Sequence, residues 1–127
     1  MRLGYFQEIK GSDMVLLSCD SAEIRMLRAS LSRGISRGSA VAIHDLAKVS
    51  HRYPARLFVC PEAATVDAST RDFVWRLSDN EYSDLDAKIE ALESVLAGHQ
   101  YFPLPGTSSE LMISVGEYSD QWWQHDA

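Results

Sequence analysis

The order of apolar and polar residues along the chain predicts a series of short strands. Apolar residues 3–9 and 14–18 flank the segment Lys10-Gly11-Ser12-Asp13, and this arrangement around a glycine-containing turn is typical of a β-hairpin. Further apolar or alternating runs have the length of strands, and these are residues 40–43 (with an extension as far as Val49), 56–60, 72–77, 99–104 and 110–115. The pattern therefore predicts six or seven strands.

A first amphipathic helix is predicted directly after the hairpin. Its apolar face consists of Ile24, Leu27 and Leu31, which recur at helical spacing. Asp20 and Glu23 form a capping box at its start, and Gly34 suits a helix C-terminus. We therefore predict a helix over residues 21–33 that buries one face.

A second amphipathic helix is predicted in the acidic half of the chain. Its apolar face consists of Leu85, Ile89, Leu92 and Leu96. Ser78 and Glu81 form a second capping box, Ser83 is an alternative cap, and Gly98 is expected to end the helix. We expect all four residues of the apolar face to be buried.

Together these elements predict an α+β fold of one domain, residues 1–127. Because each helix has a single apolar stripe, both helices are expected on one face of a mainly antiparallel sheet. The segments 14–34 and 74–98 each contain a strand, an acidic cap and a helix, which indicates two β-α units side by side. In the last strand, the alternation directs Leu111, Ile113 and Val115 to the core, and Met112 and Ser114 to solvent.

The composition is that of a globular protein with a full hydrophobic core. The chain has 127 residues, of which 46% are hydrophobic and 24% charged, and this excludes disordered and fibrous classes. No apolar run approaches the roughly 20 residues of a membrane span. The first residues lack the apolar core of a signal peptide, so we expect a cytoplasmic location and no membrane partner.

The net charge of −6 is distributed unevenly along the chain. Residues 1–60 contain nine Lys or Arg and five Asp or Glu, whereas residues 61–127 contain three and thirteen. An acidic chain disfavours nucleic acid as a partner, because neutralisation of phosphates by basic residues supplies most non-specific affinity. The two halves either intermingle their charges on one surface, which we favour, or leave a local basic patch.

The basic residues concentrate on the first predicted helix and in the loop that follows it. They are Arg25, Arg28, Arg33 and Arg37. Arg25 and Arg28 are neighbours on a helix surface and are candidates for binding an anionic partner. The favoured alternative is that they contact the acidic second helix, which carries Asp84, Asp86, Glu90 and Glu93. Binding of RNA by this segment is disfavoured by the net charge.

No group of residues forms a recognisable catalytic or cofactor motif. His44, Asp45 and His51 could bind a metal or orient a base, but neighbours on a strand point to opposite faces. The glycine-containing loop 33–39 follows a helix, whereas a phosphate loop precedes one. The nucleophile elbow, the P-loop and the dinucleotide fingerprint are absent from the sequence. We therefore predict no catalytic residue, no metal site and no cofactor.

The remaining candidate functional residues are two cysteines and the aromatic residues near the C-terminus. Cys19 and Cys60 are expected to be reduced, buried thiols, and a disulfide between them is the less favoured alternative. Tyr118, Trp122 and Trp123 either pack back on the domain or form an aromatic patch for a partner. Adjacent residues on an extended chain point apart, so one tryptophan can anchor inward while the other faces outward.

These features favour a small acidic cytoplasmic protein that acts by non-catalytic binding of another macromolecule. The partner is a protein or a second copy of the chain, and an inhibitor or immunity protein is one concrete form. The candidate partner-binding residues are Tyr118, Trp122, Trp123, Arg25 and Arg28. The alternative is a small-molecule enzyme or ligand binder with a pocket between sheet and helices, in which His44, His51 or His99 acts with a carboxylate.

Overall fold

The computed structural model describes residues 1–9 and 12–123, apart from the side chains of Glu8 and Ile9. This part of the chain forms an α+β fold with eight strands and three helices. In chain order they are β1 (Arg2–Ile9), β2 (Ser12–Cys19), α1 (Ser21–Ser36), β3 (Val41–Ala42), α2 (Ile43–Leu46), β4 (Lys48–Val49), β5 (Leu57–Pro61), β6 (Phe73–Leu77), α3 (Asp79–Glu93), β7 (Gly98–Pro103) and β8 (Glu110–Val115). None of these helices combines the length and the apolar character needed to cross a bilayer.

The strands form two mixed sheets rather than one mainly antiparallel sheet. The larger sheet has the order β4-β1-β2-β8-β7 and the smaller one the order β3-β5-β6. The predicted hairpin is confirmed as the antiparallel pair β1 and β2, but β8 then lies parallel to β2, and β6 lies parallel to β5. The prediction was only partly right on strand direction, because direction depends on how each connection runs across the sheet, and local patterning of the sequence does not register this.

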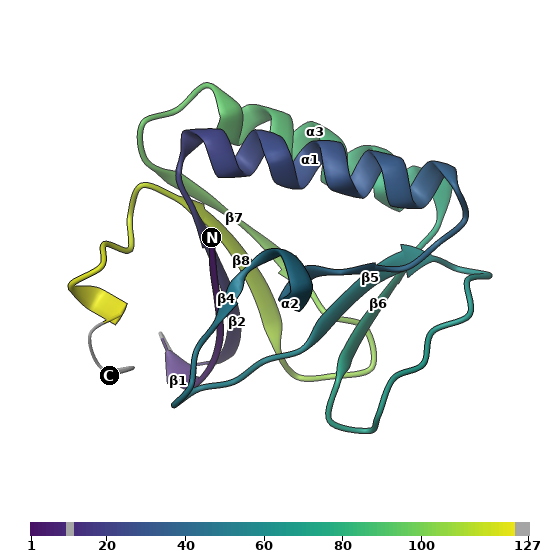
Figure 1. Cartoon of the computed structure of the whole chain (residues 1–127), viewed down its shortest axis with the longest axis horizontal. Coiled ribbons are helices and arrows are strands. Elements are labelled where there is room, and N and C mark those ends of the chain that lie inside the picture. Colours follow the sequence, from purple (N-terminus) through teal and green to yellow (C-terminus); the bar gives the residue numbers. More distant parts are fainter. Residues whose placement is uncertain (10–11, 124–127) are drawn as a thin grey trace.

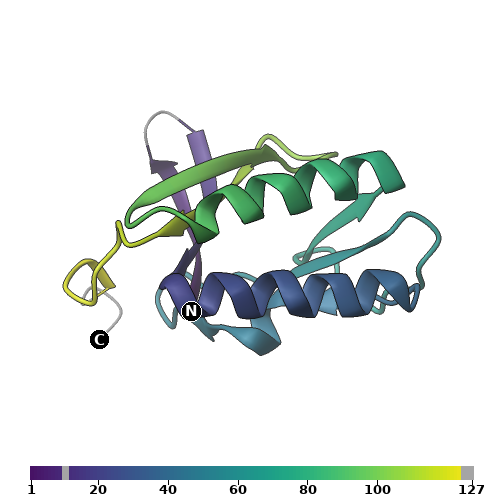
Figure 2. The same cartoon turned by 90° about the horizontal axis from the view of Figure 1, so that it is seen from above.

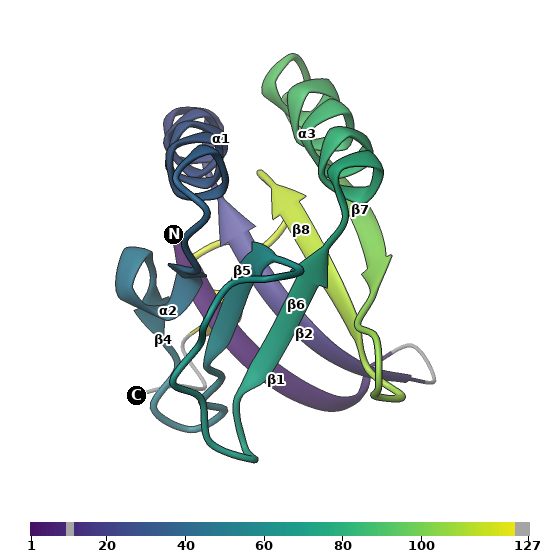
Figure 3. The same cartoon turned by 90° about the vertical axis from the view of Figure 1, so that its right-hand side faces the viewer.

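The two long helices lie side by side on the same side of the sheets, as predicted. Figure 1 shows α1 and α3 above the strands, and the end view in Figure 3 places both on one side. From above, they run antiparallel to each other (Figure 2). Their apolar residues pack into one core with the inward-facing residues of both sheets. The central residues of this core include Leu17, Leu27, Leu57, Ile89 and Ile113.

Helix α1 begins where the sequence predicts and ends one turn later. The Asp20 side chain accepts a hydrogen bond from the Glu23 backbone N–H, and the Glu23 side chain accepts one from the Asp20 N–H, so the capping box is confirmed. Gly34 lies inside the helix instead of ending it. A Cβ at Gly34 would lie 2.2 Å from Cγ2 of Val41, so glycine here lets β3 approach the helix closely.

Helix α3 is also capped as predicted but ends earlier than expected. The Ser78 and Glu81 capping box is confirmed, and Leu85, Ile89 and Leu92 are buried. The expectation for Leu96 was wrong, because the helix ends at Glu93 and the chain turns away toward β7. Leu96 lies in that turn with 93% of its surface exposed.

The segment expected as one strand over residues 40–49 is divided between the two sheets. β3 pairs with β5 in the smaller sheet, and β4 pairs with β1 in the larger one. One helical turn, α2, separates them and redirects the chain from one sheet to the other. A two-residue strand has too few residues to show a period, so the sequence pattern merges the three elements.

A second apolar cluster covers the face of the larger sheet that points away from the helices. It consists of Phe6, Met14, Leu16, Met112 and Trp123. Met112 and Ser114 were expected to face solvent, and both are fully buried. The alternation along β8 holds, but the outward-facing positions are buried as well because the C-terminal segment packs over this face of the sheet.

Replacement of Met112 by alanine tests whether this side chain is buried, as in the structure, or faces solvent, as the alternation along the strand predicts. We expect Met112→Ala to lower the free energy of unfolding by about 2–4 kcal/mol, because it creates a cavity in the second cluster. Leu96→Ala is the matched control and should change it by less than about 0.5 kcal/mol, because Leu96 is exposed. Urea denaturation measures both changes, and equal losses in the two variants would contradict the structure.

Candidate functional site

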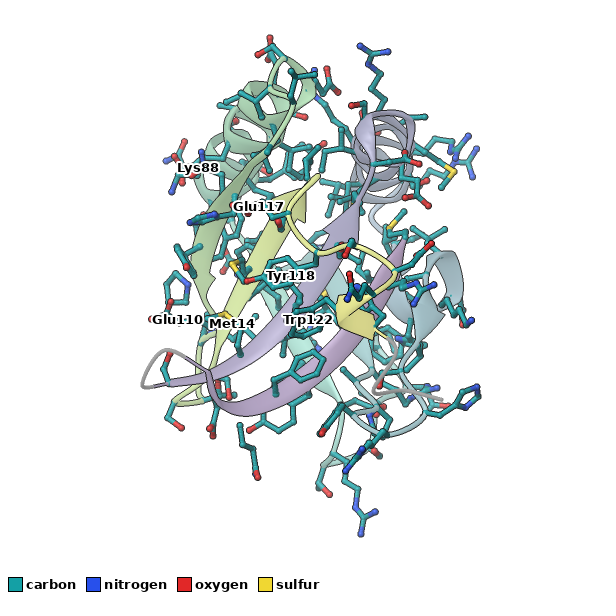
Figure 4. The ribbon with its side chains drawn as sticks, turned by 90° about the vertical axis from the view of Figure 1, so that its left-hand side faces the viewer. Met14, Lys88, Glu110, Glu117, Tyr118 and Trp122 are labelled. Atoms are coloured by element: carbon teal, nitrogen blue, oxygen red, sulfur yellow. The ribbon has the colours of Figure 1, made fainter. Side chains whose placement is uncertain are left out.

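The C-terminal segment folds back over the outer face of the larger sheet. The Gly116 N–H donates a hydrogen bond to the Cys19 carbonyl oxygen at 3.2 Å, and Arg2 forms an ion pair with Asp120 at 3.0 Å. A short turn follows, in which the Trp122 N–H donates to the Ser119 oxygen at 3.0 Å. In Figure 4, Tyr118 and Trp122 lie in front of the sheet, on the same side as Met14. The tail is therefore part of the packed structure.

The two adjacent tryptophans have different environments, as expected, but they do not point apart, because the chain forms a turn at residues 120–123 instead of an extended segment and the two rings contact each other. Trp123 is 3% exposed and belongs to the second apolar cluster, whereas Trp122 is half-buried at the edge of this cluster. The Trp122 ring is held by Phe6 (4.9 Å between centroids), Tyr118 (4.9 Å) and Trp123 (5.0 Å). Trp123 anchors the tail, and Trp122 presents part of its ring to solvent.

Gly4 makes room for these rings on β1. A Cβ at this position would lie 2.8 Å from Cε2 of Phe6 and 3.3 Å from Cζ3 of Trp123. A side chain on Gly4 would therefore displace the Phe6 ring, on which Trp122 and Trp123 rest. The tail can pack in this position only because residue 4 has no side chain.

The half-buried rings of Tyr53, Tyr118 and Trp122 form a surface that we call the aromatic surface. Tyr53 joins it from the loop between β4 and β5, where its ring lies 4.9 Å from that of Phe6 and 5.6 Å from the Arg52 guanidinium. Tyr53 was not predicted from the sequence, because no local pattern connects this loop to the C-terminal tail. Aromatic and arginine side chains are the residues most often found at the centres of protein interfaces.

A cavity of about 380 Å³ lies between the tail and the start of α1. Its lining includes Arg2, Asp20, Glu23, Tyr118 and Asp120. Cys19 also lines it, but burial, followed by the charge of Glu23, raises the pKa of its thiol to about 12. A thiol with this pKa is not a nucleophile at neutral pH. Cys19 and Cys60 are both buried and not joined to each other, so their predicted burial is confirmed.

Of the two candidate arginines, Arg28 contacts the acidic helix α3, as the favoured alternative predicts. It donates to Asp86 at 2.9 Å and to Glu90 at 2.9 Å, and it lies 3.4 Å from Glu93. The guanidinium lowers the pKa of Asp86 below its ordinary value. Arg25 is exposed beside it and lines a shallow polar groove between α1 and α3. The structure does not bring Arg25 or Arg28 to the aromatic surface, which lies on the other side of the larger sheet.

The charges of the two halves intermingle, as favoured from the sequence. Ion pairs join Arg2 to Asp120, Arg28 to Asp86 and Arg56 to Asp72, each between the basic first half and the acidic second half. Within the described residues, these pairs reduce the charge asymmetry of the sequence on the folded surface.

The three histidines in the described part of the chain, His44, His51 and His99, do not gather into one site. His44 is buried and its Nδ1 accepts a hydrogen bond from the Leu57 N–H at 3.1 Å, so it braces β5 against α2. The Asp45 carboxylate lies 3.9 Å from His44 Nε2 and is largely exposed, while His51 is exposed in a loop. No three His, Cys, Asp or Glu side chains in residues 1–9 and 12–123 converge as a metal site requires.

One histidine does contact a carboxylate on the outer face of the larger sheet. His99 Nδ1 lies 2.8 Å from Glu117, and the buried Ser114 hydroxyl donates to the same carboxylate at 2.6 Å. The carboxylate can orient the imidazole, but the serine hydroxyl is hydrogen-bonded to the carboxylate rather than to the imidazole. The group therefore lacks the nucleophile–base contact of hydrolases, and it does not line the cavities described here.

Removal of Arg28 should have an effect on stability that depends on pH. The lowered pKa of Asp86 stabilises the fold above the ordinary carboxyl pKa of about 4, and this contribution is lost as the pH falls through the lowered pKa. We therefore expect Arg28→Gln to be less stable than wild type at neutral pH, with the difference narrowing in acid. Arg25→Gln is the matched control, because Arg25 makes no ion pair with the described residues. Urea midpoints across pH test this, and a gap that stays constant would contradict it.

Replacement of each tryptophan by alanine should show that the buried Trp123 contributes more to stability than the partly exposed Trp122. Trp123→Ala should lower the free energy of unfolding by about 3–5 kcal/mol, because it empties a buried position. Trp122→Ala should cost clearly less, because part of that ring already contacts water. Urea denaturation of both variants provides the measurement, and a larger loss in Trp122→Ala would contradict this placement of the tail.

Comparison with known proteins assigns no family to this chain, because no family model, curated protein or solved structure gives a significant match.

Proposed function

We propose that this protein acts by binding another protein without catalysing a reaction, and that the aromatic surface is the centre of the contact. The observation that carries the proposal is the environment of Trp122. Its ring is only partly buried, and three neighbouring rings hold it in place above a buried cluster. A large ring fixed before binding loses little conformational freedom on binding, which favours affinity.

The surroundings of the ring support the same proposal. Tyr118 contacts the Trp122 ring directly, Tyr53 contacts the same Phe6 ring as Trp122, and Arg2 and Asp120 provide charged groups close by. Interfaces commonly combine a few aromatic anchors with a polar and charged rim. An inhibitor or immunity protein is one form that such binding takes, and the net charge of −6 favours a basic partner in solution.

The alternative is a small-molecule enzyme or ligand binder, and the contact that supports it is the one between His99 and Glu117. A general base needs a substrate within hydrogen-bond reach, and a cavity normally supplies this position. The His99 imidazole lies at the surface and lines neither the cavity beside the tail nor the groove between α1 and α3. We therefore favour binding over catalysis.

Site-specific photo-crosslinking tests the proposed function. A photoreactive phenylalanine analogue in place of Trp122 keeps an aromatic ring in the aromatic surface. Expressed in cells of the source organism, this variant should give a discrete crosslinked product, because the ring lies in the contact. The same analogue in place of Met26 is the matched control, because Met26 is an exposed apolar residue on α1, 47% exposed.

Two outcomes decide the proposal. A product at residue 122 that is absent at residue 26, and that excess wild-type protein competes away, supports it. Failure to crosslink at residue 122, or the same products at both positions, would overturn it. The mass of the product distinguishes a different protein from a second copy of this chain.

A further inference from the structure

Strand β7 is an edge of the larger sheet. It pairs with β8 on one side, in regular register from Gly98 opposite Val115 to Pro103 opposite Glu110, and no described strand lies on its other side. The opposite edge is the two-residue strand β4, which is too short to serve as a template. β7 has six residues, so it presents backbone groups along an edge long enough to pair with another strand.

The usual protection of an edge strand is weak in β7. Its sequence, Gly98-His99-Gln100-Tyr101-Phe102-Pro103, contains no lysine, arginine or acidic residue, and its register contains no bulge. Charged side chains, prolines and bulges commonly prevent such edges from pairing with other chains. Here Pro103 stands at the end of the strand and leaves the rest of the edge unprotected.

Exposed apolar side chains also occur in β7 and in the turn before it. Among the side chains that the structure describes, four large hydrophobic ones are exposed, and three of them, Val95, Leu96 and Tyr101, lie in β7 or in the turn before it. Leu96 is the most exposed, at 93%. The fourth, Met26, lies on α1. A concentration of exposed apolar side chains beside a sheet edge is typical of an interaction surface.

A groove of about 330 Å³ lies between β7 and α3. Trp75, Phe102 and Pro103 supply apolar lining, and Glu81 and Asp84 of α3 supply carboxylates. Lys88 shows how this groove accommodates a cation, since its Nζ lies 3.2 Å from Asp84 and 5.3 Å from the centre of the Phe102 ring. The hydrogen bond from the Ser78 backbone lowers the pKa of Glu81, so its carboxylate stays ionised at neutral pH.

We propose that β7 is the docking edge for an extended, basic segment of a partner protein. The segment adds a strand to the larger sheet and places an arginine or lysine side chain in the groove beside Glu81 and Asp84. In this mode of recognition, backbone hydrogen bonds supply affinity, and pockets for alternate side chains supply specificity. Charge complementarity favours a basic segment over a second copy of this chain, since two copies with a net charge of −6 repel each other.

This edge is distinct from the aromatic surface. Figure 4 shows Lys88 and Glu110 along one side of the molecule, with Trp122 farther toward the other side. The inference therefore goes beyond the proposed function, and either of them can fail without the other.

A peptide titration followed by NMR tests the docking edge. The probe is an acetylated and amidated pentapeptide of sequence TVRVT, added to the isotope-labelled full chain. We expect saturating shifts of the backbone amides of Gln100 and Tyr101 and of the Trp75 indole N–H. The peptide TVEVT, with glutamate in place of arginine, and the peptide TPRPT, whose prolines block strand pairing, should bind at least about tenfold more weakly.

Three charge-neutralising variants, one of them a control, localise the basic side chain of the probe. Asp84→Asn should weaken binding of TVRVT about two- to fivefold, because it removes one carboxylate of the groove. Asp45→Asn is the matched control, because it removes the same charge from the exposed, distant helix α2 and should leave binding unchanged. Lys88→Met should strengthen binding, because the internal cation no longer competes for Asp84 and Phe102.

Several results would overturn the proposal. These are shifts that do not saturate, shifts centred away from β7, equal binding of TVRVT and TVEVT, and equal effects of the Asp84 and Asp45 variants. Shifts of the β7 amides that depend on protein concentration alone would show that a second copy occupies the edge, which also contradicts the proposal.

Discussion

The structure depends on a sheet that buries both of its faces. Helices α1 and α3 cover one face of the larger sheet, and the segment that carries Trp122 and Trp123 covers the other. Burial of both faces excludes water from β2 and β8, whose side chains are almost all buried. It also requires close approach of the tail, which glycine at residue 4 allows. The aromatic surface exists because Trp123 fixes the tail and thereby positions Trp122 and Tyr118 beside Phe6 and Tyr53.

Ion pairs join the basic first half of the chain to its acidic second half. Arg28 contacts three carboxylates of α3 and holds the two helices together along their exposed sides. Other cross-half pairs fix the tail and the loop before β6. The carboxylates at the start of α3 face the groove beside β7 and form no contact with Arg28. The two proposed interaction surfaces consequently differ in chemistry, one being aromatic and the other an acidic groove beside an unpaired strand.

Local rules predicted the elements well, because capping and helical spacing act over a few residues. Both capping boxes, the hairpin and the inward faces of α1 and α3 follow from them. The features that these local rules did not predict depend on packing between segments far apart in the chain. Leu96 shares the spacing of the α3 face but lies beyond the end of the helix, and Met112 occupies an outward position that the tail buries. Tyr53 reached the candidate site through a contact between a loop and strand β1, which no periodicity signals.

Detection of the contact between Trp123 and β1 is the most direct test that the tail buries the second face of the larger sheet. Nuclear Overhauser measurements on the full chain can detect protons that lie within about 5 Å of each other, the range over which side chains pack. The account predicts cross-peaks from the Trp123 indole to the Gly4 Hα protons and to the Phe6 ring. Absence of these cross-peaks in a folded chain, with the Trp123 indole in contact with water, would contradict the doubly buried sheet and the aromatic surface that depends on it.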